Sequence, residues 1–312
     1  MINHIPVMKE ESIQALCVKK SGIYIDTTFG SGGHSQEILN YLNNDGKLYS
    51  IEKDFDAIKN ANKNTLSDKR FTLKHGCFSS LDVITKDWGI HGSVNGILFD
   101  LGVSSEHLDN PKRGFSFKND GPLDMRFDQN SGSPAREWIS EVSEEQLRNV
   151  IKKFGQERYA NKIAKKIISF RKSNKIENTH DLVNIINQSV PKNDKNKHNA
   201  TRTFQAIRIY INQELEVLKN ALEKSYQVLA PKGRLVLITY HSLEDRVIKD
   251  FITYTDTNLS APKDLPLDKS FLSKMFNIIS KSIKPSNEEI SANPRSRSAK
   301  LNILEKNDEN IN

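Results

Sequence analysis

A glycine-rich turn between a short apolar run and an amphipathic segment constrains the fold of this chain most strongly. The apolar run is Ile23–Ile25, Asp26 follows it, and the turn is Gly30-Ser-Gly-Gly33. The next residues, 35–42, carry apolar side chains at helical spacing. A strand, a glycine turn and a helix in this order open nucleotide-binding α/β units, because glycine lets the backbone bend sharply and approach a ligand closely.

The turn differs from the dinucleotide fingerprint G-x-G-x-x-G, because Ser35 stands at its last position. Asp26, four residues before Gly30, suits a cationic ligand without phosphate better than a pyrophosphate. This spacing is typical of methyltransferases that use S-adenosylmethionine. We therefore expect S-adenosylmethionine as the cofactor.

Strand-like runs alternate with helical patterns over the first hundred residues, and this alternation predicts a parallel sheet covered by helices on both faces. We therefore expect an α/β protein with the Rossmann-like fold of class I methyltransferases. The predicted strands are Ile23–Thr27, Lys47–Glu52, Arg70–Lys74, Val94–Asp100 and Arg234–Tyr240, and the predicted helices of the first part are Ser35–Leu42, Asp54–Asn64 and Leu81–Trp88.

More than a hundred residues separate the fourth and fifth predicted strands, far more than one crossover helix needs. A capping box at Ser143-x-x-Gln146 opens a helix that Gly155 is placed to end. A single long helix, Thr203–Leu229, runs into the fifth strand, so we assign it to the main domain. The prediction is a methyltransferase domain at 1–108 and 200–312, with an inserted helical RNA-recognition subdomain at 109–199.

The formal net charge is +7 and the sequence pI is about 9.1, which favours an anionic partner such as nucleic acid. Cys17 and Cys77 form no Cys-x-x-Cys pair, so we expect neither a disulfide framework nor a metal site. The first residues lack a secretory signal pattern and no apolar run approaches membrane-spanning length. We expect a cytoplasmic protein without a membrane partner.

Three more features follow predicted strands and, with the turn, should converge on one crevice at the carboxyl edge of the sheet. Glu52 lies 22 residues after Gly30, where a carboxylate accepts hydrogen bonds from ribose hydroxyls. Phe78 follows the third strand and is expected to pack against adenine. Asp100 ends the fourth strand.

The glycine turn and Asp100 belong to a set of motifs that is spread over the chain. The motifs are His4-Ile-Pro-Val-Met, Asp26-Thr-Thr-Phe-Gly-Ser-Gly-Gly-His-Ser35, Gly96-Ile-Leu-Phe-Asp-Leu-Gly-Val-Ser-Ser105, Arg113-Gly-Phe-Ser-Phe117, Asp120-Gly-Pro-Leu-Asp-Met-Arg126, Ala200-Thr-Arg-Thr-Phe-Gln-Ala206, His241-Ser-Leu-Glu-Asp-Arg246 and Asn293-Pro-Arg-Ser-Arg-Ser298. By these motifs the chain resembles the bacterial ribosomal small-subunit RNA cytosine-N4 methyltransferase family (RsmH, formerly MraW). The resemblance implies cofactor contacts at Gly32, Gly33, His34, Glu52, Phe78, Asp100 and His107. Glu52 stands where Asp is common in the family, and His107 where Gln is common.

The resemblance also implies the reaction, which is methylation of N4 of a cytidine in the decoding centre of 16S rRNA, near the P site. An exocyclic amine is a poor nucleophile, and a hydrogen-bond acceptor beside it helps to align it with the methyl group. Asp100 either accepts from that amine or contacts the cofactor alone. His241, after the fifth strand, either orients the base or relays a proton, or it is a structurally satisfied histidine.

Arginines and aromatic residues supply candidate RNA contacts. The loop from Arg113 to Phe117 alternates aromatic and small residues, which suits stacking of a splayed base, although Phe115 or Phe117 could instead be packed inside. Phosphate contacts are predicted from arginines across the chain. The full set of RNA candidates is Arg113, Phe115, Phe117, Asp124, Arg126, Arg202, Ser242, Arg246, Arg295 and Arg297.

Three other functions stay open at this point. A DNA or protein amino-methyltransferase has the same cofactor site. A ribosome-assembly binding module would keep the fold without activity, although Glu52, Asp100 and the glycine turn are intact. A nicotinamide dehydrogenase is the weakest alternative because of Ser35. The partner is expected to be 16S rRNA in the small subunit, with the protein either a monomer or a homodimer.

Overall fold

The computed structural model describes residues 6–191, 198–257 and 275–307. The chain forms two compact units: unit 1 is Met1–Gly102 with Leu215–Asn312, and unit 2 is Val103–Glu214. The inserted unit is therefore longer than the predicted 109–199, because residues 103–108 and 200–214 pack with it. No helix within the described ranges has both the length and the hydropathy needed to cross a membrane.

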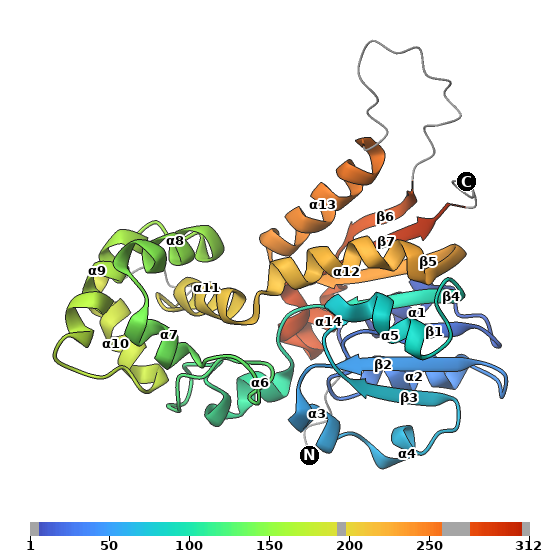
Figure 1. Cartoon of the computed structure of the whole chain (residues 1–312), viewed down its shortest axis with the longest axis horizontal. Coiled ribbons are helices and arrows are strands. Elements are labelled where there is room, and N and C mark those ends of the chain that lie inside the picture. The colour runs from blue at the N-terminus through green and yellow to red at the C-terminus, as the bar shows by residue number, and fades with distance from the viewer. Residues whose placement is uncertain (1–5, 192–197, 258–274, 308–312) are drawn as a thin grey trace, which may run out of the picture. The chain divides into compact units, whose positions relative to one another are not determined.

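Unit 1 is built on one seven-stranded sheet with the order β3-β2-β1-β4-β5-β7-β6 (Figure 1). Strands β1 to β5 pair in parallel, and β7 pairs antiparallel with both β5 and β6. The Rossmann-like α/β prediction is confirmed, and the last two strands are an addition that it did not contain. The strands are β1 (Ile23–Asp26), β2 (Lys47–Glu52), β3 (Phe71–His75), β4 (Val94–Asp100), β5 (Leu229–Thr239), β6 (Phe276–Ile283) and β7 (Lys300–Lys306).

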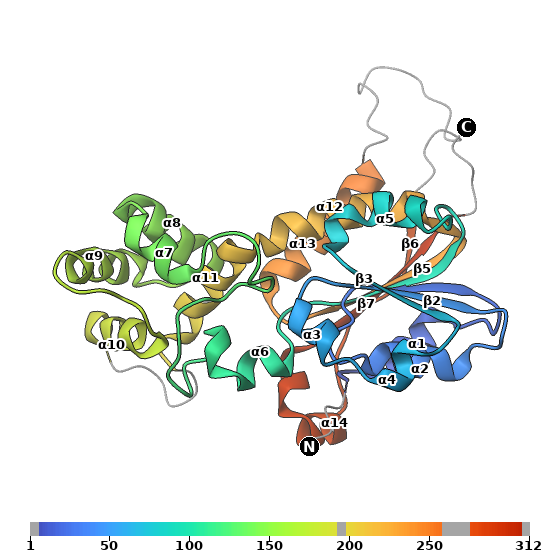
Figure 2. The same cartoon turned by 60° about the horizontal axis from the view of Figure 1, so that its bottom comes forward.

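Helices cover both faces of this sheet (Figure 2). On one face, Ile25, Ile51 and Phe99 of the strands form a core with residues of α5, α12 and α13. On the other, Tyr24 and Leu48 pack with residues of α1 and α2. The predicted helix Asp54–Asn64 is two short helices, α3 and α4. The helices of unit 1 are α1 (Lys9–Leu16), α2 (Gly33–Tyr41), α3 (Phe55–Lys59), α4 (Lys63–Leu66), α5 (Leu81–Asp87), α12 (Glu214–Val228), α13 (Ser242–Thr257) and α14 (Asn287–Ala292).

Unit 2 is helical, as predicted, and has its own apolar core. Ser143 caps α8 by accepting from the backbone N–H of Gln146 at 3.2 Å, but the Gln146 side chain donates to the Tyr210 hydroxyl. Gly155 is the last residue of α8, and a Cβ there would lie 2.5 Å from the carbonyl oxygen of Arg202. Its helices are α6 (Ser105–Asp109), α7 (Ala135–Glu141), α8 (Glu144–Gly155), α9 (Ala160–Arg171), α10 (Thr179–Ser189) and α11 (Thr201–Asn212).

The prediction of one long helix, Thr203–Leu229, is wrong. The helix is interrupted at Gln213, whose φ of +53° lies in the left-handed region. Apolar residues recur at helical spacing on both sides of Gln213, because α11 and α12 each bury one apolar face. Phe204 of α11 packs in the core of unit 2, and Leu218 of α12 packs in the core of unit 1. One periodic pattern therefore spans two helices that serve different cores.

The close approach at Gly155 leads to a stability prediction. Gly155→Ala should lower the free energy of unfolding by about 1–3 kcal/mol, as is typical of overpacking, although alanine favours helices more than glycine does. Urea denaturation measures this. Ser169→Ala, at an exposed position of α9, is the matched control and should stay within about 0.5 kcal/mol of the wild type. A Gly155→Ala protein as stable as this control would mean that α8 and α11 have room for the methyl group.

Candidate active site

The glycine turn after β1 needs glycine for steric reasons. Gly30 and Gly32 have positive φ angles of +53° and +81°. A Cβ on Gly32 would lie 2.8 Å from the Phe29 ring, and a Cβ on Gly33 would lie 2.2 Å from Cγ of Pro6. Gly33 begins α2, so the turn leads directly into a helix N-terminus. Glycine is therefore required at both positions because the turn packs directly against Phe29 and Pro6.

Asp26 holds this turn from inside. Its side chain is fully buried and accepts from the backbone N–H of Thr28 at 3.1 Å and from the hydroxyl of Ser35 at 2.7 Å. Burial raises the pKa of Asp26 in spite of these bonds. The interpretation that Asp26 faces a cationic ligand is therefore replaced by a structural role. Ser35, which stands where the dinucleotide fingerprint has glycine, has a structural role here because its hydroxyl donates to Asp26.

Glu52 ends β2 beside the turn. Its Oε2 accepts from the backbone N–H of Gly30 at 2.6 Å and its Oε1 from that of Asp54 at 2.7 Å. Burial raises the pKa of Glu52 to about 7, against the lowering effect of these two bonds. Each oxygen keeps a second lone pair, so further donors would stabilise the charged form.

Asp100, at the end of β4, lies between two side chains from other elements. The Tyr240 hydroxyl donates to Oδ1 at 2.7 Å, and Nε2 of His34 lies 3.4 Å from Oδ2. The backbone N–H of Asp100 donates to the hydroxyl of Thr28 at 2.8 Å. These partners hold the carboxylate at the carboxyl edge of the sheet, where its side chain remains 23% exposed.

Opposing effects act on the pKa of His34. Burial lowers it, but the neighbouring carboxylates Asp100 and Asp26 outweigh burial and raise it above the ordinary value. Burial and Asp100 together hold the pKa of Tyr240 well above its usual range, so its phenol stays a donor. Sequence reasoning missed Tyr240 as a site residue. Its position as the last residue of the fifth predicted strand was the signal that could have found it.

Phe78 lies at the same edge of unit 1. It is half-buried and packs edge-on against Phe99 at a centroid distance of 5.4 Å. Phe78 follows β3, and the end of β3 is bonded to β2 because the backbone N–H of Gly76 donates to the carbonyl oxygen of Glu52. The strand ends thus bring together six of the predicted cofactor residues: Gly32, Gly33, His34, Glu52, Phe78 and Asp100.

His107 and His241 are both tied into helix N-termini. In unit 2, Nδ1 of His107 accepts from the backbone N–H of Ser104, and its ring packs against Phe115 at 4.7 Å. In unit 1, the backbone N–H of His241 donates to the Glu244 carboxylate at 3.1 Å and its Nε2 lies 3.2 Å from that carboxylate. These contacts hold the His241 ring against Glu244 and fit both alternatives, so the catalytic role of His241 stays a prediction.

The sequence of the chain matches the model of the MraW methylase family over residues 1–307. The chain belongs to this family. It is 46% identical over 306 residues to the ribosomal RNA small subunit methyltransferase H of Legionella pneumophila strain Corby, covering 98% of this chain and 99% of the relative. The enzyme of the same name from strain Philadelphia 1 matches with the same identity and coverage.

A solved rRNA methylase from Streptococcus thermophilus covers 98% of this chain and 99% of its own, at 14% identity and a TM-score of 0.42, and adds nothing to the assignment. Membership rests on the family model and the Legionella relatives. S-adenosylmethionine is the methyl donor of this methylase, as the sequence predicted.

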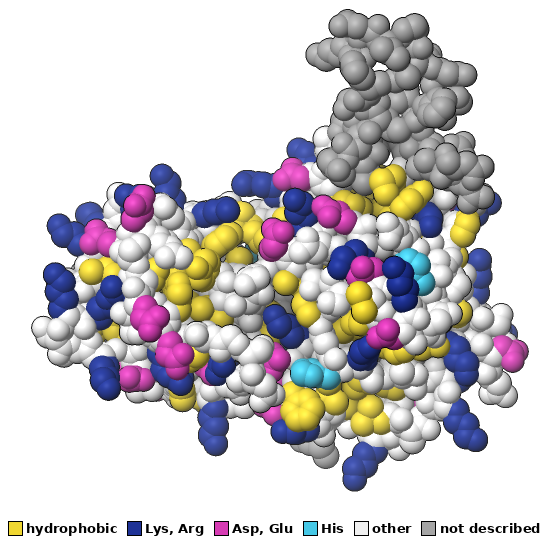
Figure 3. All heavy atoms as spheres, in the orientation of Figure 1, with side chains coloured by type: hydrophobic (Ala, Val, Ile, Leu, Met, Phe, Trp, Pro, Cys, Tyr) yellow, Lys and Arg dark blue, Asp and Glu magenta, His cyan; other side chains and the backbone are white. Residues whose placement is uncertain are grey.

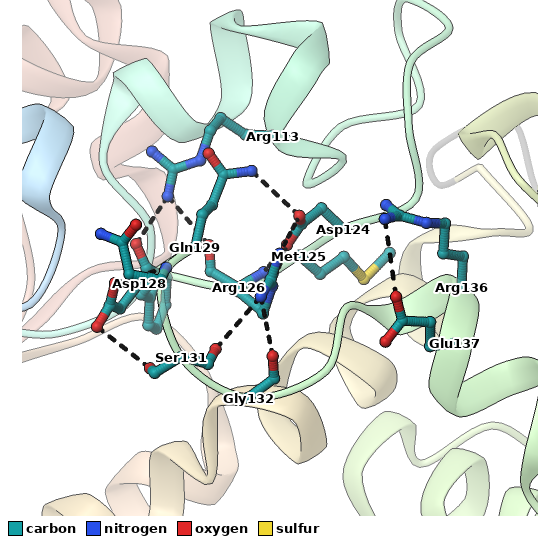
Figure 4. A network of polar contacts seen from close by, with 12 residues as sticks. Arg113, Asp124, Met125, Arg126, Asp128, Gln129, Ser131, Gly132, Arg136 and Glu137 are labelled. Atoms are coloured by element: carbon teal, nitrogen blue, oxygen red, sulfur yellow. Dashed lines mark hydrogen bonds and ion pairs between the residues drawn. The ribbon is translucent and has the colours of Figure 1, made fainter.

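Two predicted RNA contacts of the methylase, Arg113 and Asp124, lie in its interior, and a third, Arg126, pairs with Asp124 (Figure 4). Arg113 is 2% exposed, and its Nη2 donates to the carbonyl oxygens of Arg126 at 3.0 Å and Phe127 at 2.8 Å. Asp124 is also buried and forms a two-point ion pair with Arg126, with N–O distances of 2.8 and 2.9 Å. Burial alone would raise the pKa of Asp124, but the Arg126 guanidinium lowers it below its usual range. The predictions for Arg113 and Asp124 are corrected, because these buried charges hold a loop together. Arg126 is partly exposed, and its contact with RNA stays a prediction.

The two phenylalanines of the predicted stacking loop also pack inside unit 2. Phe115 is buried and stacks on Phe127 at a centroid distance of 5.4 Å, so its prediction as a base platform is wrong. Phe117 is half-buried and stacks on His198 at 4.6 Å. The remaining candidates have exposed side chains: Arg202, Ser242, Arg246, Arg295 and Arg297.

The contact between His34 and Asp100 leads to a titration prediction. Asp100→Asn should lower the pKa of His34, because the substitution removes the carboxylate that stabilises the imidazolium. An NMR titration of the imidazole signals measures this directly. Asp87→Asn, at an exposed carboxylate of unit 1, is the control and should leave the His34 titration unchanged. An unshifted titration in Asp100→Asn would show that Asp26 alone sets the pKa of His34.

Proposed function

We propose that this methylase transfers a methyl group from S-adenosylmethionine to N4 of a cytidine in the decoding centre of 16S rRNA, acting on the small ribosomal subunit in the cytoplasm. The observation that carries the reaction type is the held carboxylate of Asp100 at the edge that also bears the glycine turn and Glu52. The relatives named as small-subunit RNA methyltransferases support the choice of substrate.

The charge distribution supports an RNA substrate as well. Unit 2 contains twenty Lys and Arg and fourteen Asp and Glu, so it carries +6 of the net charge of +7. Unit 1 is almost neutral although it is larger. A concentration of positive charge in one unit suits binding to an anionic backbone. We therefore infer that unit 2, from Val103 to Glu214, supplies most of the electrostatic attraction to the RNA, in addition to the contacts from unit 1 that are assigned below.

The residues at the carboxyl edge fit the cofactor. Gly32 and Gly33 carry the turn into the N-terminus of α2, and the second lone pairs of Glu52 suit two ribose hydroxyls. Phe78 offers an apolar ring for the adenine, and His34 lies against Asp100. The remaining cofactor residue of the proposal, His107, belongs to unit 2 and follows from the family resemblance alone.

When bound, S-adenosylmethionine supplies an electrophilic methyl group. Asp100 accepts a hydrogen bond from the cytosine amine, which localises the nitrogen lone pair and aligns it with that methyl group. The sulfur of the cofactor would keep the electron pair of the broken C–S bond. The amine would lose one proton, and Asp100 would accept it in this proposal. Tyr240 is a positioning residue, because its hydroxyl fixes Oδ1 of Asp100.

RNA contacts are assigned to the exposed candidates. Phosphates are bound by Arg202, Arg246, Arg295 and Arg297, with Ser242 at the start of α13 as a neutral donor. Phe117 is the remaining aromatic for base stacking, and His241 orients the base.

Glu52 makes the cofactor affinity depend on pH. Because its pKa is about 7 without ligand and ribose donors require the charged form, lowering the pH from 8 to 6 should weaken wild-type binding more than Glu52→Gln binding. At pH 8 the Glu52→Gln substitution should itself cost about 1.5–3 kcal/mol. Calorimetry at each pH gives the ratio of the wild-type affinity to the Glu52→Gln affinity. Any titration of the ligand itself affects both proteins equally and cancels in this ratio. Glu223→Gln, exposed on α12, is the control. A constant ratio between pH 6 and 8 would remove Glu52 from the cofactor site.

The reaction is tested with labelled S-adenosylmethionine and undermethylated small subunits. Mass spectrometry of the digested RNA should find N4-methylcytidine, and Asp100→Asn should lower turnover by about 10²-fold or more with a much smaller change in cofactor affinity. A parallel loss of turnover and cofactor affinity would limit Asp100 to the cofactor. If the protein methylated DNA or peptides but left the subunits unmodified, the proposed RNA substrate would be contradicted. If it bound the subunits but formed no product, it would be an inactive assembly module.

A further inference from the structure

We infer that the outward face of α9 in unit 2 is a second RNA-contact surface, which binds phosphates of the rRNA backbone away from the methylated nucleotide. This inference rests on the proposed function and adds a site to it. We call it the α9 surface and define it by five exposed side chains: Arg158, Lys162, Lys165, Lys166 and Lys172.

The α9 surface lies in the most one-sided stretch of charge in unit 2. Residues 158–176 contain seven Lys and Arg and no Asp or Glu. The acids on either side face other partners, because Glu157 accepts from the backbone N–H of Tyr159 and Glu177 lies 3.8 Å from Arg136. The positive charge is therefore not balanced by neighbours along the chain.

One of the seven cations, Arg171, is bonded to the interior of the unit and is therefore not part of the surface. Nη1 of Arg171 donates to the carbonyl oxygens of Ile139 and Val142 at 2.6 and 2.7 Å. Among the described residues, no carboxylate pairs with any side chain of the α9 surface. Unpaired exposed cations gain more from a phosphate than paired ones, because no existing ion pair has to be broken.

Helix geometry places these cations on one side. Ile163, Ala164 and Ile167 are 0% exposed and point into the core of unit 2, so Lys162, Lys165 and Lys166 point outward. With a rise of 1.5 Å per residue, the helical stretch from Lys162 to Lys166 covers roughly 6 Å. Arg158 and Lys172 lie beyond its two ends, so the surface is long enough to meet more than one phosphate. Figure 3 shows Lys and Arg side chains projecting around the part of the molecule where Figure 1 draws α9.

Just before α9, the side chain of Arg158 is held in place by the neighbouring Tyr159. Its guanidinium lies 4.5 Å from the centroid of the Tyr159 ring, and Nη2 donates to the Tyr159 hydroxyl at 2.6 Å. Because the guanidinium covers the ring, Tyr159 offers its face to the arginine and not to a base. The surface therefore suits phosphates, which carry no sequence information, and not base recognition.

An anionic membrane is a poor fit for the same face. Helices that bind at a membrane surface insert an apolar side between the lipids. The apolar side of α9 is buried in the core of unit 2, so only charge remains to bind with. An RNA backbone needs only this charge.

The test compares two triple variants of the full chain. Lys162→Gln, Lys165→Gln and Lys166→Gln together remove three charges of the α9 surface, and glutamine has nearly the same helix propensity as lysine. The matched control changes three exposed lysines of unit 1, Lys63, Lys69 and Lys86, to Gln. Affinity for undermethylated small subunits and for protein-free 16S rRNA is measured over a range of salt concentrations, with cofactor binding as the test of folding.

The α9 variant should reduce the log–log salt slope by about 2–2.7 for both RNA probes, which corresponds to about 0.7–0.9 per lost phosphate contact. It should bind S-adenosylmethionine as the wild type does, and the control should keep the wild-type slope. A slope equal to the control would overturn the α9 surface. A loss seen with small subunits but not with protein-free RNA would also overturn it, because the partner would then be a ribosomal protein. Failure of the wild type to bind or methylate either RNA would instead contradict the proposed function.

Discussion

The buried carboxylate of Asp26 is the interaction on which the active-site edge depends. A carboxylate away from water is costly unless donors reach it, and here the donors are the backbone N–H of Thr28 and the hydroxyl of Ser35. Both belong to the segment that contains the glycine turn. Satisfying Asp26 therefore fixes the turn, the start of α2 and the direction of His34, which meets Asp100. The neighbouring strand end is also fixed through Thr28, which accepts from the backbone of Asp100.

Three strand ends of unit 1 bear carboxylates in three different environments. Asp26 is fully buried and satisfied from within. Glu52 has two backbone donors and a pKa raised by burial to about 7, so additional donors shift its charge readily. Asp100 keeps partial exposure between His34 and Tyr240. Burial and partners, and not residue type, divide these acids into a scaffold, a cofactor ligand and an acceptor for the substrate amine in the mechanism proposed here.

Charged residues in unit 2 are divided in a similar way. Arg113 is inside, where backbone carbonyls satisfy it, and the pair of Asp124 and Arg126 closes the same loop. The lysines of α9 point outward and have no acidic partner among the described residues. A buried guanidinium needs acceptors and an exposed lysine needs none, so the fold can use one as a structural link and leave the other for a partner.

The strands of the parallel sheet, the glycine turn and the helical insertion were predictable from the sequence, because they depend on local periodicity. Glu52, Phe78 and Asp100 were predicted at one edge by the rule that parallel strands end together, whereas His34 followed from the family resemblance. Local patterns could not show that the stripe from Thr203 to Leu229 belongs to two helices, since α11 and α12 both bury apolar residues at helical spacing, each in a different core. They also could not show whether Arg113 or Phe115 faces water, or that Tyr240 meets Asp100 across 140 residues of sequence. The sequence by itself determined which elements form and which strand ends carry chemical groups. Only the tertiary structure decided which of those groups are satisfied inside, because burial and hydrogen-bond partners are set by residues that are distant along the chain.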